Sequence, residues 1–182
     1  MSRIGRQPVI IPSGVTVSLT RDMITVKSAQ AELSQALPPQ IKVKMEADKI
    51  ICSNPVSTPK TDALFGLVRS LINNLVLCVT KGFRKTMEIQ GTGFRVKPAA
   101  TGLEFSLGFS HPVKFPAPPG IKLEIKENKF IVVSGADKYL VGQTAARLRD
   151  LKKPDVYKGK GIRYQGEVVK LKPGKAVKAA AA

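Results

Sequence analysis

Two stretches of this chain alternate apolar and polar residues in nearly the same way, 80 positions apart. Residues 38–45 read Pro-Pro-Gln-Ile-Lys-Val-Lys-Met, and residues 118–125 read Pro-Pro-Gly-Ile-Lys-Leu-Glu-Ile. Each stretch leads into a polar turn, at Asp48 or Asn128, and then into a second apolar run. Alternation with a period of two is typical of a strand with one buried face, so each half of the chain is predicted to contain a β-hairpin.

The apolar spacing changes to three and four residues after each hairpin. Residues 62–75 place apolar side chains at positions 64, 67, 68, 71, 72 and 75, one stripe of an amphipathic helix whose start signals lie within 58–62. Residues 140–151 form a weaker stripe, which begins after Asp137 and ends before Pro154. One helix is therefore predicted to follow each hairpin.

Both predicted helices contain a glycine in their first turns, Gly66 in one and Gly142 in the other. A glycine inside a helix costs about 1 kcal/mol relative to alanine. We therefore expect close packing of each helix on its sheet to compensate for this cost.

The chain is predicted to be a tandem duplication. Strand-like runs at residues 23–26 and 103–107 precede the two hairpins, so each half reads as several short strands followed by one helix. This order favours an α+β fold: two small domains, each a mostly antiparallel β-sheet packed against one α-helix, with a basic C-terminal tail. We expect the first domain at 1–82, the second at 83–172 and a flexible, Ala-rich tail at 173–182.

Positive charge is abundant and unevenly distributed. The chain has 30 Lys and Arg against 13 Asp and Glu, a formal net charge of +17. Residues 147–178 alone contain 11 positive and 3 negative side chains, a net +8. Such a charge attracts polyanions, of which nucleic acid is the commonest and an anionic membrane the second.

The pattern favours neither a membrane protein nor a secreted one. The longest apolar stretch, residues 67–79, is interrupted by four polar residues, and the N-terminus has no stretch of the signal-peptide type. The basic segment is broken by Gly and Pro and so is not an amphipathic helix with apolar anchors, which argues against a membrane partner. Cys52 and Cys78 lie in apolar surroundings without metal-ligand spacing, which suits a reducing compartment.

Residues suited to catalysis or metal binding are scarce. His111 is the single histidine, without a cysteine at ligand spacing, and the acidic residues are scattered. Gly91-Thr92-Gly93 lacks the third glycine of a dinucleotide-binding loop and is better explained as a bend or bulge of a strand. We therefore expect no enzyme activity, no metal, no cofactor and no small-molecule substrate.

Residues 152–164 have the chemistry that best suits a polyanion, because lysines, glycines and tyrosines are interleaved there. Lys and Arg make charge-assisted bonds to phosphate. Tyr157 and Tyr164 would stack on exposed bases or bind a 2′-hydroxyl, which favours RNA over duplex DNA. Asp155 is expected to order the turn after Pro154.

Gly159 and Gly161 have two interpretations. They are flexible spacers between lysines, or they let the backbone lie close to the sugar-phosphate chain. On the second interpretation, alanine at both positions would leave folding intact and weaken RNA binding by about 1–3 kcal/mol.

Residues 154–162, Pro-Asp-Val-Tyr-Lys-Gly-Lys-Gly-Ile, resemble the hallmark run of bacterial-type large-subunit ribosomal protein six, a universal ribosomal protein family. The opening Ser2–Val9, the run Val79–Phe83 and the run Gln90–Arg95 resemble the same family, and the similarity covers residues 2–172. Gln90-Gly91-Thr92 and the Ala-rich tail depart from the family pattern, and both lie outside the basic segment.

The resemblance implies a structural constituent of the large ribosomal subunit, with the second domain as the main rRNA-binding domain. It also implies a position near the sarcin–ricin loop and the base of the lateral stalk, where translation factors dock, beside neighbouring large-subunit proteins. The residues expected to contact rRNA are Arg3, Arg6, Lys153, Tyr157, Lys158, Gly159, Lys160, Gly161, Arg163, Tyr164, Lys170, Lys172 and Lys175. We expect a cytoplasmic ribosome, with an organellar one left open, and the alternative is a non-ribosomal basic RNA-binding protein.

Overall fold

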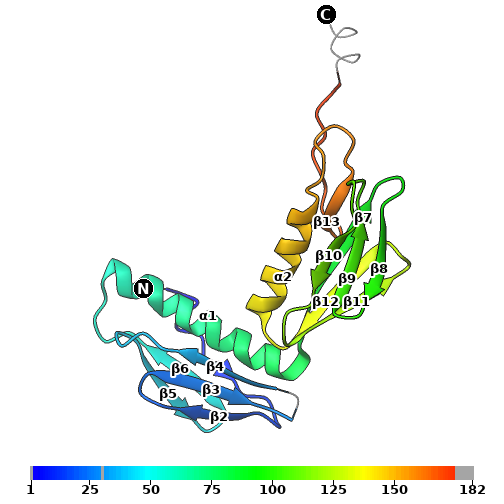
Figure 1. Ribbon diagram of the computed structural model, residues 1–182. Helices are drawn as coiled ribbons and strands as arrows, with labels where there is room; N and C mark the ends of the chain where they lie inside the picture. The colour runs from blue at the N-terminus through cyan, green and yellow to red at the C-terminus, as the bar shows by residue number, and fades with distance from the viewer. Residues whose placement is uncertain (1, 30, 175–182) are drawn as a thin grey trace, which may run out of the picture. The chain divides into compact units, whose positions relative to one another are not determined.

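The computed structural model describes residues 2–29 and 31–174, and the chain forms two compact units that divide between Gly82 and Phe83. Each unit has its own hydrophobic core, and among the described residues none belongs to both cores. Figure 1 shows the elements of both units.

The first unit consists of short strands followed by one long helix (Figure 1). In chain order, its elements are β1 (Val9–Ile10), β2 (Thr16–Leu19), β3 (Met23–Lys27), β4 (Glu32–Ala36), β5 (Lys42–Glu46), β6 (Lys49–Ser53) and α1 (Pro59–Lys81). One antiparallel sheet has the strand order β2-β3-β4, and the other has the order β1-β6-β5. The hairpin β5–β6 turns at Ala47 and Asp48, as the alternation predicted.

Helix α1 is longer than the predicted stripe because it continues to Lys81. Thr58 caps its first turn: Thr58 Oγ1 accepts a hydrogen bond from the Thr61 backbone N–H (3.2 Å), and Thr61 Oγ1 accepts one from the Thr58 N–H (2.9 Å). Gly82 ends the helix with a positive φ of 65°, which favours glycine, and its N–H donates to the Cys78 carbonyl oxygen.

The apolar face of α1 forms much of the core of the first unit. Its buried residues are Phe65, Val68, Ile72, Val76, Cys78 and Val79. All of these except Cys78 belong to one cluster with strand residues such as Ile24, Val26 and Ile50. By length and composition alone, α1 would also suit a membrane-spanning helix, the one such helix in the described part of the chain. Burial of this face against the strands explains part of the apolar composition of α1, whereas Leu67 and Leu77 of the same helix are exposed.

The second unit repeats this plan. In chain order, its elements are β7 (Phe83–Gln90), β8 (Arg95–Ala99), β9 (Gly102–Ser106), β10 (Val113–Pro116), β11 (Ile121–Lys126), β12 (Phe130–Gly135), α2 (Lys138–Leu151) and β13 (Gly161–Tyr164). One antiparallel sheet has the order β10-β9-β8, and the other has the order β11-β12-β7-β13.

The predicted duplication and the α+β class are confirmed. The meander β2-β3-β4 and the hairpin β5–β6 correspond to β8-β9-β10 and β11–β12, and one helix follows each hairpin. The second unit adds strand β13, which pairs antiparallel with β7. Within the described residues of the first unit, no strand follows α1, so β13 is the main departure from the repeat.

Helix α2 begins as predicted after Asp137, whose Oδ1 accepts a hydrogen bond from the Tyr139 N–H (2.8 Å). Its buried residues are Val141, Thr144, Ala145 and Leu148. This face packs on β7, β12 and β13, where Met87, Ile131 and Ile162 have no exposed surface. Strand β13 is therefore built into the core and is not a surface addition.

The expectation that both helix glycines pack closely on a sheet is wrong. At Gly142, a Cβ would meet no atom within 4 Å, so the space beside this glycine is open. At Gly66, a Cβ would lie 2.9 Å from Ser2 Oγ, so the close neighbour is the N-terminal segment and not a strand. Periodicity assigns a residue to one face of a helix, but it does not determine what covers that face.

Candidate RNA interface

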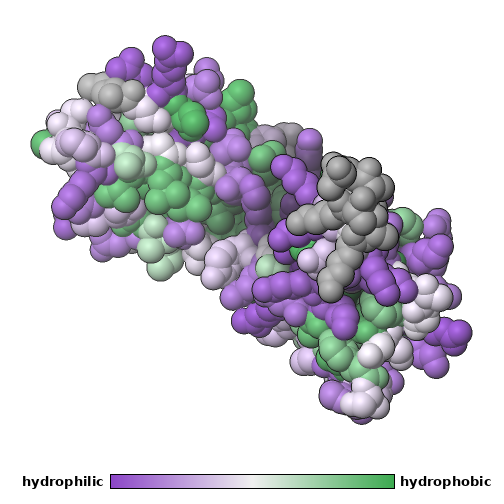
Figure 2. Space-filling view, turned by 90° about the horizontal axis from the view of Figure 1, so that it is seen from above, coloured by the Kyte–Doolittle hydropathy of each residue, from purple (hydrophilic) through white to green (hydrophobic). Residues whose placement is uncertain are grey.

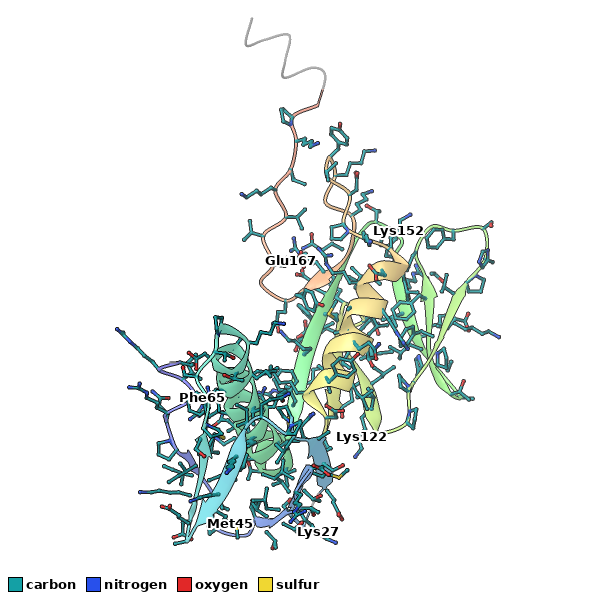
Figure 3. All side chains as sticks on the ribbon, turned by 90° about the vertical axis from the view of Figure 1, so that its left-hand side faces the viewer. Lys27, Met45, Phe65, Lys122, Lys152 and Glu167 are labelled. Carbon is teal, nitrogen blue, oxygen red and sulfur yellow. The ribbon has the colours of Figure 1, made fainter. Side chains whose placement is uncertain are left out.

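The chain between α2 and β13 forms an ordered loop at residues 152–160; Lys152, at its start, is labelled in Figure 3. Asp155 organises this loop with three hydrogen bonds. Its Oδ2 accepts from the Lys158 N–H (2.9 Å), its carbonyl oxygen accepts from the Gly159 N–H (2.9 Å), and its N–H donates to the Lys160 carbonyl oxygen (3.0 Å). The prediction that Asp155 orders the turn is confirmed.

The backbone of the loop is held by these hydrogen bonds, and several of its side chains extend into solvent. The exposed members of the predicted set in this loop are Lys153, Tyr157, Lys158 and Lys160. Lys153 Nζ lies 3.3 Å from Asp150 Oδ1, and Lys160 Nζ lies 3.4 Å from Thr92 Oγ1. Exposed contacts of this kind contribute little to stability, so a phosphate oxygen can replace them at small cost.

The chain that follows β13 runs back along this loop (Figure 3). The Lys172 N–H donates to the Val156 carbonyl oxygen at 2.8 Å, which joins the two segments. Lys170 and Lys172 are both exposed, so the fold brings their charges to the same end of the unit as the loop lysines. Lys175, also predicted to bind RNA, lies outside the described residues.

Gly161 has an internal role that the sequence did not reveal. It is buried at the start of β13, and a Cβ there would lie 2.7 Å from the Lys153 carbonyl oxygen and 2.7 Å from Pro154 Cα. These are backbone atoms, which cannot move aside cheaply, and φ at Gly161 is 153°. Gly161 thus lets β13 lie against residues 152–154, and this close packing argues against the expectation that alanine here leaves folding intact.

Gly159 is different from Gly161. Its φ is 68°, a left-handed conformation that favours glycine, and a Cβ would lie 3.5 Å from Leu171 Cδ2, an ordinary contact. The turn around Asp155 therefore requires glycine at position 159 for its backbone conformation. The absence of a side chain matters less, because a Cβ would fit there. The N–H of Gly159 is engaged by Asp155 within the loop.

Arg163 and Tyr164 lie on β13 and are partly committed to the unit itself. Arg163 Nε donates to Glu88 Oε2 on β7 at 3.0 Å, and about a fifth of each side chain is exposed. This bond is the main cause that holds the pKa of Glu88 below its usual value, while burial acts in the opposite direction. Lys85 Nζ lies 5.5 Å from the centre of the half-buried Tyr164 ring, a cation–π contact.

Glu167 ties the end of β13 to α2, and Figure 3 labels it beside that strand. Its Oε1 accepts a hydrogen bond from Arg149 at 2.6 Å, and its Oε2 accepts one from the Tyr164 N–H at 3.0 Å. These two donors, Arg149 first, hold the pKa of Glu167 below its usual value. The carboxylate therefore fixes where the chain turns back toward the basic loop.

Arg3 and Arg6 are exposed residues of the N-terminal segment of the first unit. Gly5 between them is buried against the Phe65 ring of α1. It lies so close that a Cβ at this position would overlap the ring. The segment is thus anchored on α1 at Gly5 and presents the two arginines to either side of this anchor. They therefore belong to a different unit from the basic loop.

Two further residues at the loop end, Phe109 and Thr92, were missed by sequence reasoning. Lys152 Nζ lies 4.4 Å from the centre of the Phe109 ring, and Phe109 belongs to the β9–β10 connection. Thr92, in the turn between β7 and β8, meets Lys160 as described above. No spacing in the sequence links these positions to the basic segment, since only the pairing of strands brings the three loops together.

The surface at this end of the second unit is mainly cationic and polar. In Figure 2, the second unit is viewed from this side, and hydrophilic side chains prevail there, with small hydrophobic areas between them. His111 is exposed in the β9–β10 connection, and in the described residues no group of three or more His, Cys, Asp or Glu side chains is placed to hold a metal ion. The arrangement suits contact with phosphates and exposed bases.

Comparisons with known proteins agree with this chemistry. The family model described as ribosomal protein L6 matches residues 11–82 and 90–165, one match in each unit. The large ribosomal subunit protein uL6 of Hydrogenobaculum sp. (strain Y04AAS1) is 46% identical over 96% of this chain and 96% of its own length. The proteins of the same name from Gemmatimonas aurantiaca and Trichodesmium erythraeum are each 44% identical, over 97% and 98% of this chain and 98% and 99% of their own lengths. Since the family model matches most of the chain and these relatives align along nearly all of it, the chain belongs to the ribosomal protein L6 family.

Proposed function

We propose that this chain is a structural constituent of the large ribosomal subunit and binds large-subunit rRNA through the basic end of its second unit. Membership of the ribosomal protein L6 family carries this proposal, and the relatives named above are large-subunit proteins. The family is one of ribosomal structural proteins, so the chain is not an enzyme.

The described surface has the chemistry that this role requires. The loop at 152–160 and the returning segment present five exposed lysines: Lys153, Lys158, Lys160, Lys170 and Lys172. Contacts to phosphates supply affinity and position, whereas unpaired bases and 2′-hydroxyls supply selectivity. Tyr157, with 58% of its surface exposed, is the residue of this set best suited to a base or a 2′-hydroxyl.

The remaining residues of the predicted set have smaller proposed roles. Arg163 would have to share its guanidinium between Glu88 and a phosphate, and the half-buried Tyr164 offers less ring surface than Tyr157. Arg3, Arg6 and Lys175 are further proposed contacts, outside the surface described for the second unit. Gly161 acts through the shape of the loop, because it is buried under residues 152–154.

Within the subunit, we infer a position near the sarcin–ricin loop and the base of the lateral stalk. The support is the resemblance of residues 154–162 to the hallmark run of the family. In that position the chain would lie beside other large-subunit proteins and close to docking translation factors, in the ribosomes of the cytoplasm. Its rigid two-sheet second unit would hold the basic loop in one conformation against the rRNA.

Salt dependence tests the rRNA contact. If about 6–10 phosphates are bound, the affinity of the full chain for an rRNA fragment that contains the sarcin–ricin loop should fall roughly 10³–10⁵-fold between 50 and 200 mM salt. Base changes within paired regions of the fragment should have little effect, because the backbone supplies most contacts. An affinity that stays flat across this salt range contradicts the proposal.

Sedimentation and footprinting separate the ribosomal role from the alternative, a non-ribosomal basic RNA-binding protein. The tagged chain should sediment with large subunits at physiological salt, and reconstitution should protect the sarcin–ricin region from chemical modification. Sedimentation outside the large-subunit fraction would favour the alternative. Protection at a different rRNA site would leave the ribosomal role in place and remove the proposed position.

A further inference from the structure

Phe109 stands apart from the other phenylalanines of this chain. There are seven, and all lie within the described residues. Six are buried or half-buried, whereas 44% of the Phe109 surface is exposed. Phe83, Phe94 and Phe115 pack against the core of the second unit, and Phe109 is not a member of that cluster. The hydrophobic core therefore does not account for this ring.

The Phe109 ring lies beside a cation of the proposed RNA surface. Lys152 Nζ, at the start of the basic loop, is 4.4 Å from the ring centre. The exposed Arg95 begins β8 in register with Ser106, the last residue of β9, so a second cation lies on the strand beside the Phe109 connection. An exposed aromatic ring in a positively charged surface is an arrangement that proteins use to bind single-stranded RNA.

The connection that carries Phe109 is held where it leaves β9. Leu107, which precedes it, has 1% of its surface exposed, and Gly108 turns the chain with φ of 74°. A buried residue followed by a left-handed glycine directs the chain out of the core at this point. Phe109 is thus presented on an ordered support.

We propose that Phe109 stacks on an unpaired base of the rRNA, while Lys152 is positioned by the same ring to neutralise a phosphate of that nucleotide. This inference rests on the proposed function and adds a selective contact to it. Lysines alone would bind any phosphate backbone, whereas a stacking ring selects sites where a base is free of its helix.

The chain contains no tryptophan, which makes a direct test simple. In the Phe109→Trp variant the single indole reports on its own surroundings, and stacking on a base quenches its fluorescence. We expect strong quenching on titration with an rRNA fragment that contains unpaired bases, and little quenching with a fully paired duplex that still binds. The control is Tyr139→Trp, at an exposed ring in the first turn of α2, which should not be quenched.

Affinity provides the second measurement. Phe109→Ala and Phe109→Leu should both weaken binding to the fragment roughly 5- to 150-fold, the range for loss of one base stack. Both variants should keep the wild-type salt slope, because neither removes a charge, and Tyr139→Ala should bind like the wild type. Because Phe109 lies outside the core, both variants should unfold at the wild-type temperature.

Failure of this inference is distinguishable from failure of the proposed function. If the chain binds the fragment with steep salt dependence, but the Phe109→Trp variant is not quenched and Phe109→Leu binds normally, base stacking is wrong and rRNA binding stands. Equal quenching by a fully paired duplex also overturns stacking on an unpaired base. If the wild-type chain does not bind rRNA at all, both proposals fall.

Discussion

The two units share one plan, but they diverge after the helix. In the first unit, α1 ends at Gly82 and the chain passes directly into β7. In the second unit, α2 leads into the basic loop 152–160, then β13, then the returning segment. Residues 1–82 have a net charge of +5 and the rest of the chain has +12. Duplication thus supplied the scaffold, whereas the segment added after α2 supplies the proposed RNA surface.

The largest expected difference is in RNA affinity of the separated units. Because the cores share no residue within the described parts of the chain, each unit should fold alone. Fragment 83–178 should bind the rRNA fragment roughly 100-fold or more tightly than fragment 1–82, since counterion release scales with the phosphates contacted. Titration of both fragments, with circular dichroism to verify folding, checks this. Equal binding by two folded fragments would remove the division of labour.

The next effect concerns β13, which only the second unit has. Gly161→Ala would push a Cβ into the backbone of residues 153 and 154, so we expect a loss of about 2–4 kcal/mol in the free energy of unfolding. Gly93→Ala is the matched control: it also has a positive φ, of 80°, but has open space around it, and should cost only about 1 kcal/mol. Denaturant unfolding measures both. Similar losses in the two variants would mean that close packing at Gly161 is unimportant.

Charge at the loop can be compared with charge on the first unit. Lys158→Ala with Lys160→Ala should weaken rRNA binding about 10- to 100-fold and reduce the salt slope by about 2, because two phosphates lose their partners. Lys42→Ala with Lys44→Ala removes the same charge from the exposed strand β5. This control should change the affinity little. If both pairs act alike, net charge and not the loop determines binding.

Acid should loosen β13 before it affects the strands of the first unit. Glu88 and Glu167 have lowered pKa values in the folded chain, so their ionised forms stabilise the folded state. This stabilisation is complete above the unfolded pKa of about 4.3 and is lost as pH falls through the folded pKa values. Hydrogen exchange of the Tyr164 amide, which donates to Glu167, should therefore accelerate as pH falls, after correction for intrinsic rates.

The control amide for this measurement is Ser28, which lies beside the exposed Lys27–Glu32 pair of the first unit. Exposed ion pairs contribute little to stability, so the corrected exchange rate of the Ser28 amide should change less as pH falls. A Glu167→Gln variant should exchange faster at neutral pH and respond less to acid. If the Tyr164 amide in this variant has the wild-type pH profile, Glu167 does not hold the segment.

The smallest effect compares the two helix glycines. Gly142→Ala should stabilise the chain by about 0.5–1 kcal/mol, because the space is open and alanine is the better helix former. Gly66→Ala should not give this stabilisation, since its Cβ would lie 2.9 Å from Ser2 Oγ and the N-terminal segment would have to move. Thermal unfolding of the two variants distinguishes them. Equal stabilisation would mean that the Ser2 contact is readily displaced.

Local patterns in the sequence were sufficient to predict the repeat, the α+β class and the start of both helices. Alternation of period two, stripes of spacing three and four, and caps such as Asp137 are written in neighbouring residues. The ordering role of Asp155 was also predictable, because an Asp after a proline bonds to backbone a few residues ahead. The cations of the basic segment were also identified from neighbouring residues, because they are clustered in the sequence.

Which distant residues meet depends on the tertiary structure. The sequence could not show that Gly161 lies against residues 152–154, that Glu88 and Glu167 hold β13, or that Lys152 lies on Phe109. These contacts join positions up to 75 residues apart, Arg163 and Glu88 being the most distant of them. They result from the pairing of β13 with β7 and from the packing of α2 on that sheet, and no local period encodes such pairings.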